Sequence, residues 1–568
     1  MKKKEPKRSQ HDHPQSGSIE LFWKLTIVSL LLLTCIGFYL RSVNSSRTNL
    51  VAIYNEVAYL DLARDFKDRG SLVQVMKAYF LGEEKEDNRH PMYSMILSRF
   101  INYEAEDFAK AKLINLVVGL ILILSMFSLS YLLWGVEVAC LSALFLGISP
   151  TMVFLSSQAA SDLLFAWLYF LSLGILMKYS EKRWACLVYG MLCGLAYLTK
   201  GNGYLLLLPP FVLGLWNYQK AFLKKPHIYM IVFAFAFISS FLIFRNILVF
   251  HNPFHNINSK VFWLDRWTDY YLLSSGPQWG QVGPVWYLSH HNLSQIIIRL
   301  FYGTLSVGVK LLLSMSIGPK SCLTASGVIM LGMALLGLVL KWRDGYRKQV
   351  VVVAGMGGFF FLLFSWYDQA VGGDIRFIFP VAVSLIPFSA IGVISLYGFI
   401  CAKITKAPRP RILILISVSL IALLNIYLER SAFTVNPLGL SYYPAEWKEP
   451  SLWMREHMGN QEFLLNNDSF FSQWDCYRDK RISYPFDVPE DVLDHYVLAN
   501  GIKYIVVDQS LIMSDPFKEK YRVYDEYGPT LFMGWPRCYH DTKKPSWFVI
   551  YSQEFQQKTI QPDNPSIH

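Results

Sequence analysis

Long apolar runs recur along the chain from residue 21 to residue 428, and they constrain its fold more than any other feature. A helix that crosses the hydrocarbon core of a bilayer needs roughly 20 mainly apolar residues. About eleven runs meet that need, at approximately 22–40, 112–133, 137–155, 161–178, 184–199, 203–216, 228–249, 323–341, 349–366, 377–400 and 411–428. The pattern predicts a polytopic α-helical membrane protein with about 11–13 transmembrane helices.

The charge content supports the same class. Charged residues make up 17% of the 568 residues, whereas soluble domains carry about 25%. This deficit excludes most soluble enzymes, disordered chains and chains that coat nucleic acid, so we expect a membrane lipid environment and no nucleic-acid partner. The net charge of +11 then matters through its distribution, because membrane insertion sorts Lys and Arg by side.

The basic clusters predict the orientation of the chain. They lie in the N-terminal tail and in the short loops at 178–183, 220–225, 341–348 and 403–411. With eleven spans, all of these fall on one side, which we interpret as cytoplasmic. The first run lacks a small-residue cleavage site, so we expect a retained helix and a cytoplasmic N-terminus. The amphipathic segment 295–316 is expected at the interface or as a re-entrant element, because a crossing there would move the cluster at 341–348 outside.

These spans divide the chain into four parts. We predict a cytoplasmic basic tail at 1–20, a transmembrane domain at 21–429, an extracytoplasmic α/β domain at 430–555 and a disordered tail at 556–568. Two large outer loops interrupt the transmembrane domain, at 41–111 and 250–294. Strand-like runs at 463–465 and 504–507, with a helical stretch at 489–500 between them, suggest the α/β domain.

Ionisable side chains gather at the predicted outer ends of the spans. An ionisable group at membrane depth costs on the order of 3 kcal/mol, so such residues usually have a function. The candidates in or beside the spans and in the first outer loop are Asp162, Lys200, Arg245 and Arg376, and Asn55, Glu56, Arg89 and His90. Cations and carboxylates at one membrane face suggest that an anionic substrate is handled there.

The first outer loop carries two short motifs. Glu56 lies near the start of a helix-compatible stretch that ends at Gly70, and its carboxylate could act as a general base or bind a substrate hydroxyl. It could equally be a helix N-terminal charge that the helix dipole favours. Arg89 and His90 precede Pro91 and suit phosphate binding, although a solvated interfacial turn explains them as well.

The remaining candidates also allow a simpler interpretation. Asp162 follows Ser161 at the start of a span and can serve as a helix N-terminal acid. Lys200 lies between two short spans and beside glycines, which suits an anion site or a tight hairpin with a lysine reaching the interface. Arg245 and Arg376 each lie at a span end, where arginines commonly act as interfacial anchors.

The order of these motifs resembles that of the GT-C glycosyltransferases that use polyprenyl-phosphate sugars, in particular the protein O-mannosyltransferases and the lipid A aminoarabinose transferases. The matching positions run in the family's order over about residues 20–400: Glu56, His90-Pro91, Asp162, Leu198-Thr199-Lys200-Gly201, Arg245-Asn246 with Asn252-Pro253, and Arg376-Phe377. One position departs from the family pattern, because the chain has Asn55 where the family has the aspartate of an Asp-Glu pair.

The resemblance implies a GT-C fold and an inverting single displacement on the extracytoplasmic side. The sugar would pass from a polyprenyl-phosphate donor to a lipid, glycan or protein acceptor. Glu56 and Asp162 would then be catalytic, and Asn55, Arg89, His90, Lys200, Arg245 and Arg376 would bind substrate. A carboxylate would take the acceptor's proton, and the cations would stabilise the departing phosphate. Since Asn55 cannot take a proton at neutral pH, Glu56 or Asp162 takes that role, the acceptor needs no base, or the protein is impaired.

The remaining expectations concern cofactors and alternative functions. The resemblance does not require a divalent metal, and the sequence shows no compact carboxylate cluster that would bind one. A transporter or flippase for a lipid-linked or anionic solute, and a catalytically inactive binding protein, are the alternatives. The absence of an evident repeat and the position of the charges at one face argue against the transporter.

Overall fold

The computed structural model describes most of the helical region and the strands of the C-terminal region. Its described residues are 16–49, 55–102, 107–266, 269–270, 273, 277–317, 323–371, 373–404, 410–434, 453, 457, 463–466, 481–483, 497, 502–508, 531–532, 535–540 and 548–552. The predicted tail at 556–568, most of the tail at 1–20 and the predicted helix at 489–500, apart from Val497, lie outside this set.

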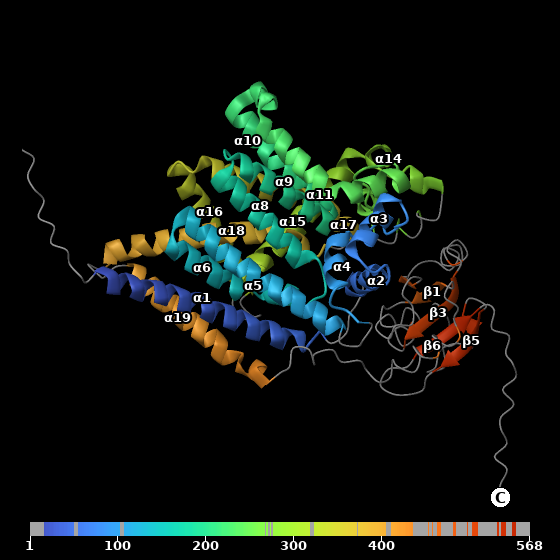
Figure 1. The fold of residues 1–568 in the computed structure, drawn as a ribbon, viewed down its shortest axis with the longest axis horizontal. Coiled ribbons are helices and arrows are strands. Elements are labelled where there is room, and N and C mark those ends of the chain that lie inside the picture. Colours follow the sequence, from blue (N-terminus) through green and yellow to red (C-terminus); the bar gives the residue numbers. More distant parts are fainter. Residues whose placement is uncertain are drawn as a thin grey trace, which may run out of the picture.

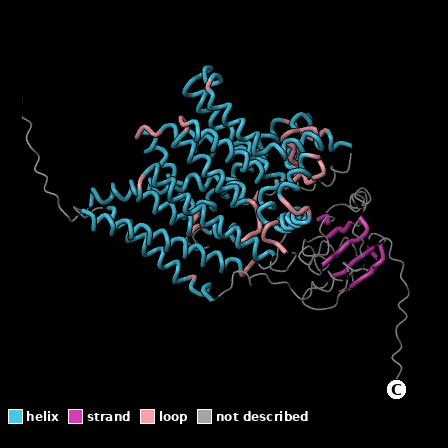
Figure 2. The backbone as a smooth tube through the Cα atoms, in the orientation of Figure 1, coloured by secondary structure: helices cyan, strands magenta, loops and turns pink. Residues whose placement is uncertain are grey.

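Up to residue 434, the described residues form helices and the turns and loops that connect them (Figures 1 and 2). The long or apolar helices are α1 (Ser16–Ser46), α5 (Asp107–Trp134), α6 (Val136–Gly147), α7 (Pro150–Ser156), α8 (Asp162–Tyr179), α9 (Arg183–Thr199), α10 (Leu208–Tyr218), α11 (Pro226–Phe250), α15 (Leu293–Met315), α16 (Leu323–Arg343), α17 (Arg347–Val371), α18 (Ile375–Ile404) and α19 (Pro410–Leu428). Short helices fill the connections: α2 (Asn55–Asp68), α3 (Leu72–Phe80), α4 (Pro91–Leu97), η1 (Gly201–Leu207), η2 (Gln219–Lys224), α12 (Asn258–Val261), η3 (Pro277–Gly280), α14 (Pro284–His290) and η5 (Arg430–Thr434).

Among the described residues, eight helices are long and apolar enough to cross a membrane, or nine if the bent pair α6 and α7 forms one span. Shorter apolar helices cover three further predicted runs, at Arg183–Thr199, Gly201–Trp216 and Ile416–Leu428. The chain is therefore an integral multi-pass membrane protein, as predicted. The α6–α7 break bends by 60° because Pro150 stands at the start of α7 with Ser149 as its N-cap, and proline does not continue a helix from the preceding turn.

The helix α15 has the length of a span, yet its contacts place it across the end of α17. Arg299 donates to the carbonyl of Trp366, and Lys310 pairs with Asp368. The two α15 residues are about 16 Å apart along their helix, whereas the two α17 residues are about 3 Å apart along theirs. These contacts do not give the depth of α15 in a membrane, and the interfacial or re-entrant placement of 295–316 stays a prediction.

The first outer loop folds into three short helices that cover one end of the bundle (Figure 1). The helix expected before Gly70 is α2, and Gly70 follows it with φ +91°. The helix α4 begins at Pro91, with His90 as its N-cap in extended geometry, because a residue before proline avoids the helical region. We refer below to the end of the bundle that carries these helices as the α2–α4 end.

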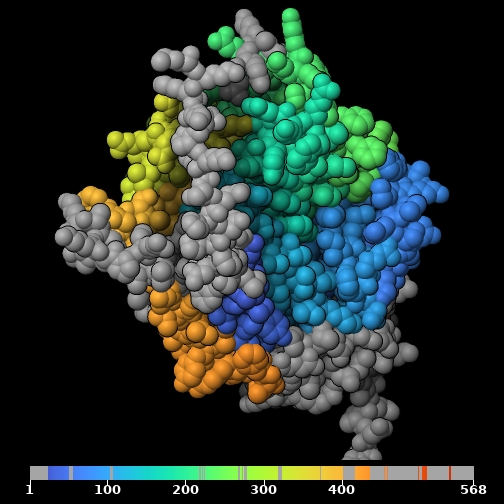
Figure 3. Space-filling model, turned by 60° about the vertical axis from the view of Figure 1, so that its left-hand side comes forward, coloured from blue at the N-terminus to red at the C-terminus, as the bar shows by residue number. Residues whose placement is uncertain are grey.

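Two helices form the centre of the bundle. Within their apolar windows, 72% of α8 and 83% of α18 are buried, against 39% of α1. At the periphery α1 lies beside α19 (Figures 1 and 3), where Gly37 packs on Asn425. The first residues of α8 and α18 are therefore held by the best-packed part of the molecule, and these residues include Asp162 and Arg376.

The C-terminal strands form one mixed sheet (Figure 2). Its strands are β1 (Phe463–Asn466), β2 (Arg481–Ser483), β3 (Ile502–Asp508), β4 (Leu531–Phe532), β5 (Trp535–His540) and β6 (Phe548–Ser552), in the order β2-β1-β3-β6-β5-β4. Parallel pairing joins β1 to β2 and β3, and antiparallel pairing joins the others. The predicted strand runs at 463–465 and 504–507 are the parallel neighbours β1 and β3, with Leu465 opposite Ile505.

Candidate functional site

Three predicted residues meet at the α2–α4 end. Asp162 is the first residue of α8, Lys200 is the C-cap of α9, and Arg376 is the second residue of α18. The Lys200 ammonium donates to the Asp162 carboxylate, and the Arg376 guanidinium Nη1 lies 4.0 Å from Asp162 Oδ2. Two cations that are far apart in sequence thus share one buried carboxylate.

The exposure of this trio is uneven. The Asp162 side chain is 4% exposed, whereas those of Lys200 and Arg376 are 18% and 21% exposed. Arg376 Nε also pairs with Asp374 Oδ2 at 3.1 Å, and Lys200 Nζ lies 5.1 Å from the centre of the Phe377 ring. An anion that approaches this end meets the cations first, because the carboxylate that orients them lies beneath.

Glu56 and Asn55 open α2 and face different neighbours. Glu56 Oε1 accepts hydrogen bonds from the Ala159 backbone N–H at 3.0 Å and from Asn49 Nδ2 at 3.1 Å. Asn55 Oδ1 accepts from Arg89 Nη2 at 3.3 Å. The Glu56 carboxylate is therefore held by the backbone of Ala159, three positions before Asp162 in the chain, whereas the Asn55 amide is bonded to Arg89.

His90 packs against the residues on either side of Lys200. Its ring packs edge-on against Tyr197, with 5.0 Å between ring centres. A Cβ on Gly201 would come within 3.1 Å of His90 Nε2, which explains the glycine beside Lys200. Burial, and secondarily the charge of Arg245, lower the pKa of His90 to about 3. The imidazole is consequently neutral at physiological pH, and it can donate one hydrogen bond without carrying charge.

Arg245 is near this site but has no contact with Asp162 among the interactions that the structure describes for it. Its guanidinium donates to the Glu86 carbonyl and lies over the rings of Tyr79 and Phe250, at 5.4 and 5.1 Å. Arg245 is 3% exposed, so we interpret it as a support for the first outer loop. The following residue, Asn246, donates to the carbonyl of Pro253 at 3.2 Å and so closes the turn of the predicted Asn-Pro motif.

Several partners in this cluster are not among the residues predicted from the sequence. The Tyr59 hydroxyl lies 2.7 Å from Ser161 Oγ and fixes α2 against the start of α8. Asp374 forms an ion pair with Arg376. Lys310 of α15 forms another with Asp368, near the end of α17. Tyr59 follows Glu56 by three positions, so it shares a helix face with it, which is a signal that the sequence did contain. The Lys310–Asp368 contact depends on the crossing of α15 over α17 and had no such signal.

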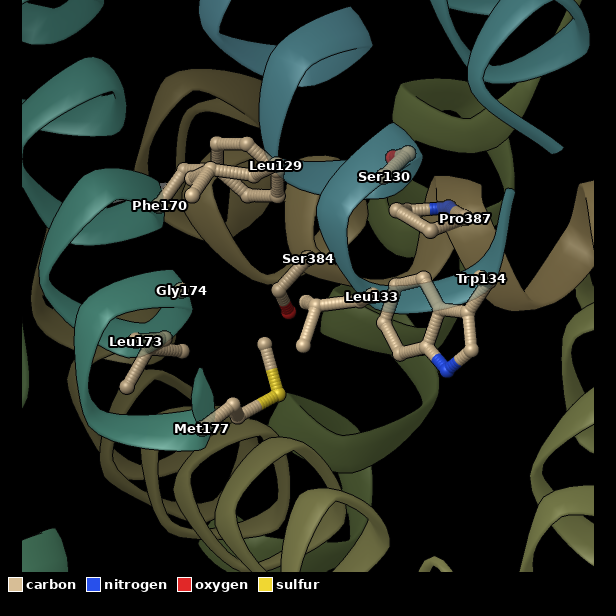
Figure 4. Close-up of a pocket in the computed structure, with 10 residues that line it drawn as sticks. All are labelled: Leu129, Ser130, Leu133, Trp134, Phe170, Leu173, Gly174, Met177, Ser384 and Pro387. Carbon is tan, nitrogen blue, oxygen red and sulfur yellow. The ribbon is translucent and has the colours of Figure 1, made fainter. Parts of the chain in front are cut away.

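In the part of the chain that the structure describes, neither a metal-ligand cluster nor the apolar gap at the centre of the bundle adds to this site. Among the described residues, no group of three or more His, Cys, Asp or Glu side chains is placed to hold a metal ion. A narrow apolar gap with no room for a water molecule lies among α5, α8 and α18 (Figure 4). Leucines, Phe170, Met177 and Trp134 line most of it, and none of the predicted site residues does.

The comparisons with known proteins point to one class. Residues 88–244 match the family model for dolichyl-phosphate-mannose-protein mannosyltransferases. This segment contains Arg89, His90, Asp162 and Lys200 and ends one residue before Arg245. No curated protein matches the sequence.

Solved structures of two enzymes share the fold. ArnT from Cupriavidus metallidurans in the apo state has a TM-score of 0.51 and 12% identity, over 94% of this chain and 98% of that chain. The same protein bound to undecaprenyl phosphate has a TM-score of 0.50 and 14% identity, over 95% and 98%. The oligosaccharyltransferase of Archaeoglobus fulgidus, tethered to an acceptor peptide, has a TM-score of 0.51 and 14% identity, over 88% of this chain and 72% of that chain.

Proposed function

From the premise that this chain is a membrane protein with the fold of the GT-C glycosyltransferases, we propose that it transfers a sugar from a polyprenyl phosphate to an acceptor hydroxyl. The observation that carries the proposal is the convergence of Lys200 and Arg376 on Asp162. The neutral His90 and the fixed carboxylate of Glu56 lie at the same end of the bundle. This end would be the extracytoplasmic one, as the basic loops predict.

The donor's polyprenyl tail would stay in the bilayer, and its phosphate would lie against Lys200 and Arg376. Undecaprenyl phosphate is the lipid bound in the ArnT structure, and a similar lipid is the donor carrier that we propose here. Both cations are partly exposed and are oriented by Asp162. They would stabilise the negative charge that develops on the leaving phosphate.

The chemical step would be a single displacement. The acceptor oxygen forms a bond to the anomeric carbon while the bond from that carbon to the phosphate oxygen breaks, so the configuration inverts. The acceptor's proton passes to a carboxylate, and the polyprenyl phosphate leaves with the electron pair of the broken bond. We assign the proton to Glu56, because two cations contact Asp162 and reduce its basicity. Asp162 would then position Lys200 and Arg376.

Purified full-length protein in lipid nanodiscs tests this proposal. Mannosyl and aminoarabinosyl undecaprenyl phosphates with a radiolabelled sugar serve as donors, and the measurement is release of the sugar from the lipid. Donor cleavage that depends on Lys200 supports the enzyme. Movement of intact donor across vesicle membranes without cleavage would instead identify a flippase and overturn the proposal, as would donor binding with no cleavage of either lipid.

A further inference from the structure

A polar cavity lies outside the predicted site and is lined by none of the site residues assigned above. It is an open cavity of about 430 Å³ lined by Asp265, Arg266 and Asp269 of the outer loop, the start of α15 and the end of α17. Most of its lining side chains are polar: Asp265, Arg266, Asp269, His291, Gln295 and Gln369. Its position beside α14 and α15 places it at the same end of the bundle as Asp162.

One wall of the cavity is rigidly built. Asp265 accepts hydrogen bonds from the Tyr287 hydroxyl at 3.3 Å, from Arg299 Nη1 at 3.4 Å and from His291 Nε2 at 2.8 Å. The Arg299 side chain is 1% exposed and also donates to the carbonyl of Phe262 at 3.2 Å. Asp265 is nonetheless 42% exposed. Its carboxylate is therefore held in place while part of it faces the cavity.

The other side chains that line the cavity are polar and carry no excess of one charge. Gln369 and Gln295 are exposed, and amides offer both donors and acceptors. Asp269 faces the cavity with Arg266, to whose backbone N–H it is bonded at 2.9 Å. Arg266 and Arg299 balance the charges of Asp265 and Asp269, so the lining of the cavity has no excess of positive charge to attract an anion. The cavity consequently suits a neutral ligand with many hydroxyls better than it suits a phosphate.

One turn of α17 joins the cavity to the predicted site. Gln369 lines the cavity, and the Trp366 carbonyl accepts from Arg299 in its wall. Tyr367, on the same turn, packs edge-on against Phe377, with 5.8 Å between ring centres, and its hydroxyl donates to Asn258 Oδ1 at 2.9 Å. Phe377 in turn contacts Lys200, so the end of α17 would connect an acceptor held in the cavity to the cations that would bind the donor phosphate.

We propose that this cavity is the subsite for a neutral carbohydrate portion of the acceptor. The assignment rests on the proposed function and narrows it, because it favours a glycan or glycolipid acceptor over an unmodified protein. Donor binding and sugar release to water would not use the cavity. The acceptor subsite and the proposed sugar transfer can therefore be tested separately.

Saturation-transfer difference NMR on the full chain in nanodiscs tests the subsite directly. The probes are four neutral disaccharides (mannobiose, cellobiose, maltose and lactose), glucuronic acid and a peptide with Ser and Thr. We expect ring-proton signals from at least one neutral disaccharide and none from the peptide. The variants Gln369→Ala and Asp269→Asn should reduce these signals at least fivefold, since both remove groups that face the cavity without altering the Asp265 cluster.

The matched controls are Asp344→Asn, an exposed carboxylate paired with Lys341 in another loop, and Lys200→Ala. Neither should change the disaccharide signal, although Lys200→Ala should abolish donor cleavage. Binding by none of the neutral disaccharides, binding by the peptide alone, or unchanged binding in both cavity variants would overturn the subsite. If the wild-type protein binds a disaccharide but cleaves neither donor, the proposed function is overturned instead.

Discussion

The Lys200 ammonium donates a hydrogen bond to the carboxylate of Asp162, 38 positions earlier in the chain. The contact joins the end of one apolar helix to the beginning of another. Neither residue has a partner of opposite charge within its own helical turn, so the pairing depends on how α8 and α9 pack. It defines the part of the molecule on which the predictions below depend.

Lys200→Ala should abolish sugar transfer. Without the ammonium, the leaving phosphate loses one of its two stabilising cations, and we expect kcat/KM to fall by about 10²-fold or more. The matched control is Lys348→Ala, which removes a lysine that bonds to Ser180 in the other half of the bundle. Release of labelled sugar from the lipid donor is the measurement, and equal activity in the two variants would remove Lys200 from the site.

Glu56→Gln should eliminate transfer while the protein still inserts and folds. The glutamine carbonyl can accept the bonds from Ala159 and Asn49, so only the charge and the basicity are lost. Glu83→Gln is the control in the same outer loop, where Glu83 is more than half exposed. Comparable activity in Glu56→Gln and wild-type protein, at equal amounts in the membrane, would refute the assignment of the base.

Asn55→Asp should retain at least wild-type activity. The new carboxylate replaces an amide oxygen that already accepts from Arg89, and a charged acceptor strengthens that bond. If the asparagine limits catalysis, the rate should rise, because an aspartate would supply a second base beside Glu56. A drop of tenfold or more in the transfer assay would show that the amide itself is needed.

His90 predicts a specific dependence of stability on pH. Its pKa in the folded protein is lowered to about 3, whereas histidine in an unfolded chain titrates near 6.5. Between those values the unfolded chain holds one more proton, so the free energy of unfolding should decrease as the pH falls below about 6.5. The decrease amounts to at most about 2 kcal/mol between pH 7 and pH 5.

Thermal unfolding of wild-type protein and His90→Gln in nanodiscs checks this dependence. The unfolding midpoint of the wild-type protein should drop more between pH 7 and pH 5 than that of the variant, which lacks the titrating ring. Parallel curves for the two proteins would mean that His90 is not buried as a neutral group.

Gly303→Ala should destabilise the bundle. A Cβ at Gly303 would lie 1.7 Å from the Ser365 carbonyl oxygen, so α15 and α17 would have to separate, at a cost of about 1–3 kcal/mol. In the same helix, a Cβ at Gly308 would meet no atom within 4 Å, and Gly308→Ala should leave the midpoint unchanged or raise it. A midpoint for Gly303→Ala equal to that of Gly308→Ala would contradict the crossing of α15 over α17.

Most of the fold could be predicted from the pattern of apolar runs. Their length predicts helices in a bilayer, and the helix before Gly70, the turn at His90-Pro91 and the strands β1 and β3 follow from local residue preferences. The prediction of the number of long spans was less accurate, because several apolar runs form helices of 17 residues or fewer, and one run breaks at Pro150. Run length alone does not show such breaks.

The sequence predicted which residues could belong to the candidate site, but not which of them contact one another. The sequence by itself determined that Asp162, Lys200 and Arg376 lie at helix ends, because charged groups are excluded from the apolar interior of the spans. Only the tertiary structure decided that Lys200 and Arg376 share Asp162, that Arg245 supports a loop instead, and that Asn55 and Glu56 face different partners. The physical reason is that hydropathy fixes how deep a residue lies along its helix, whereas the rotation and packing of each helix fix which neighbour it meets.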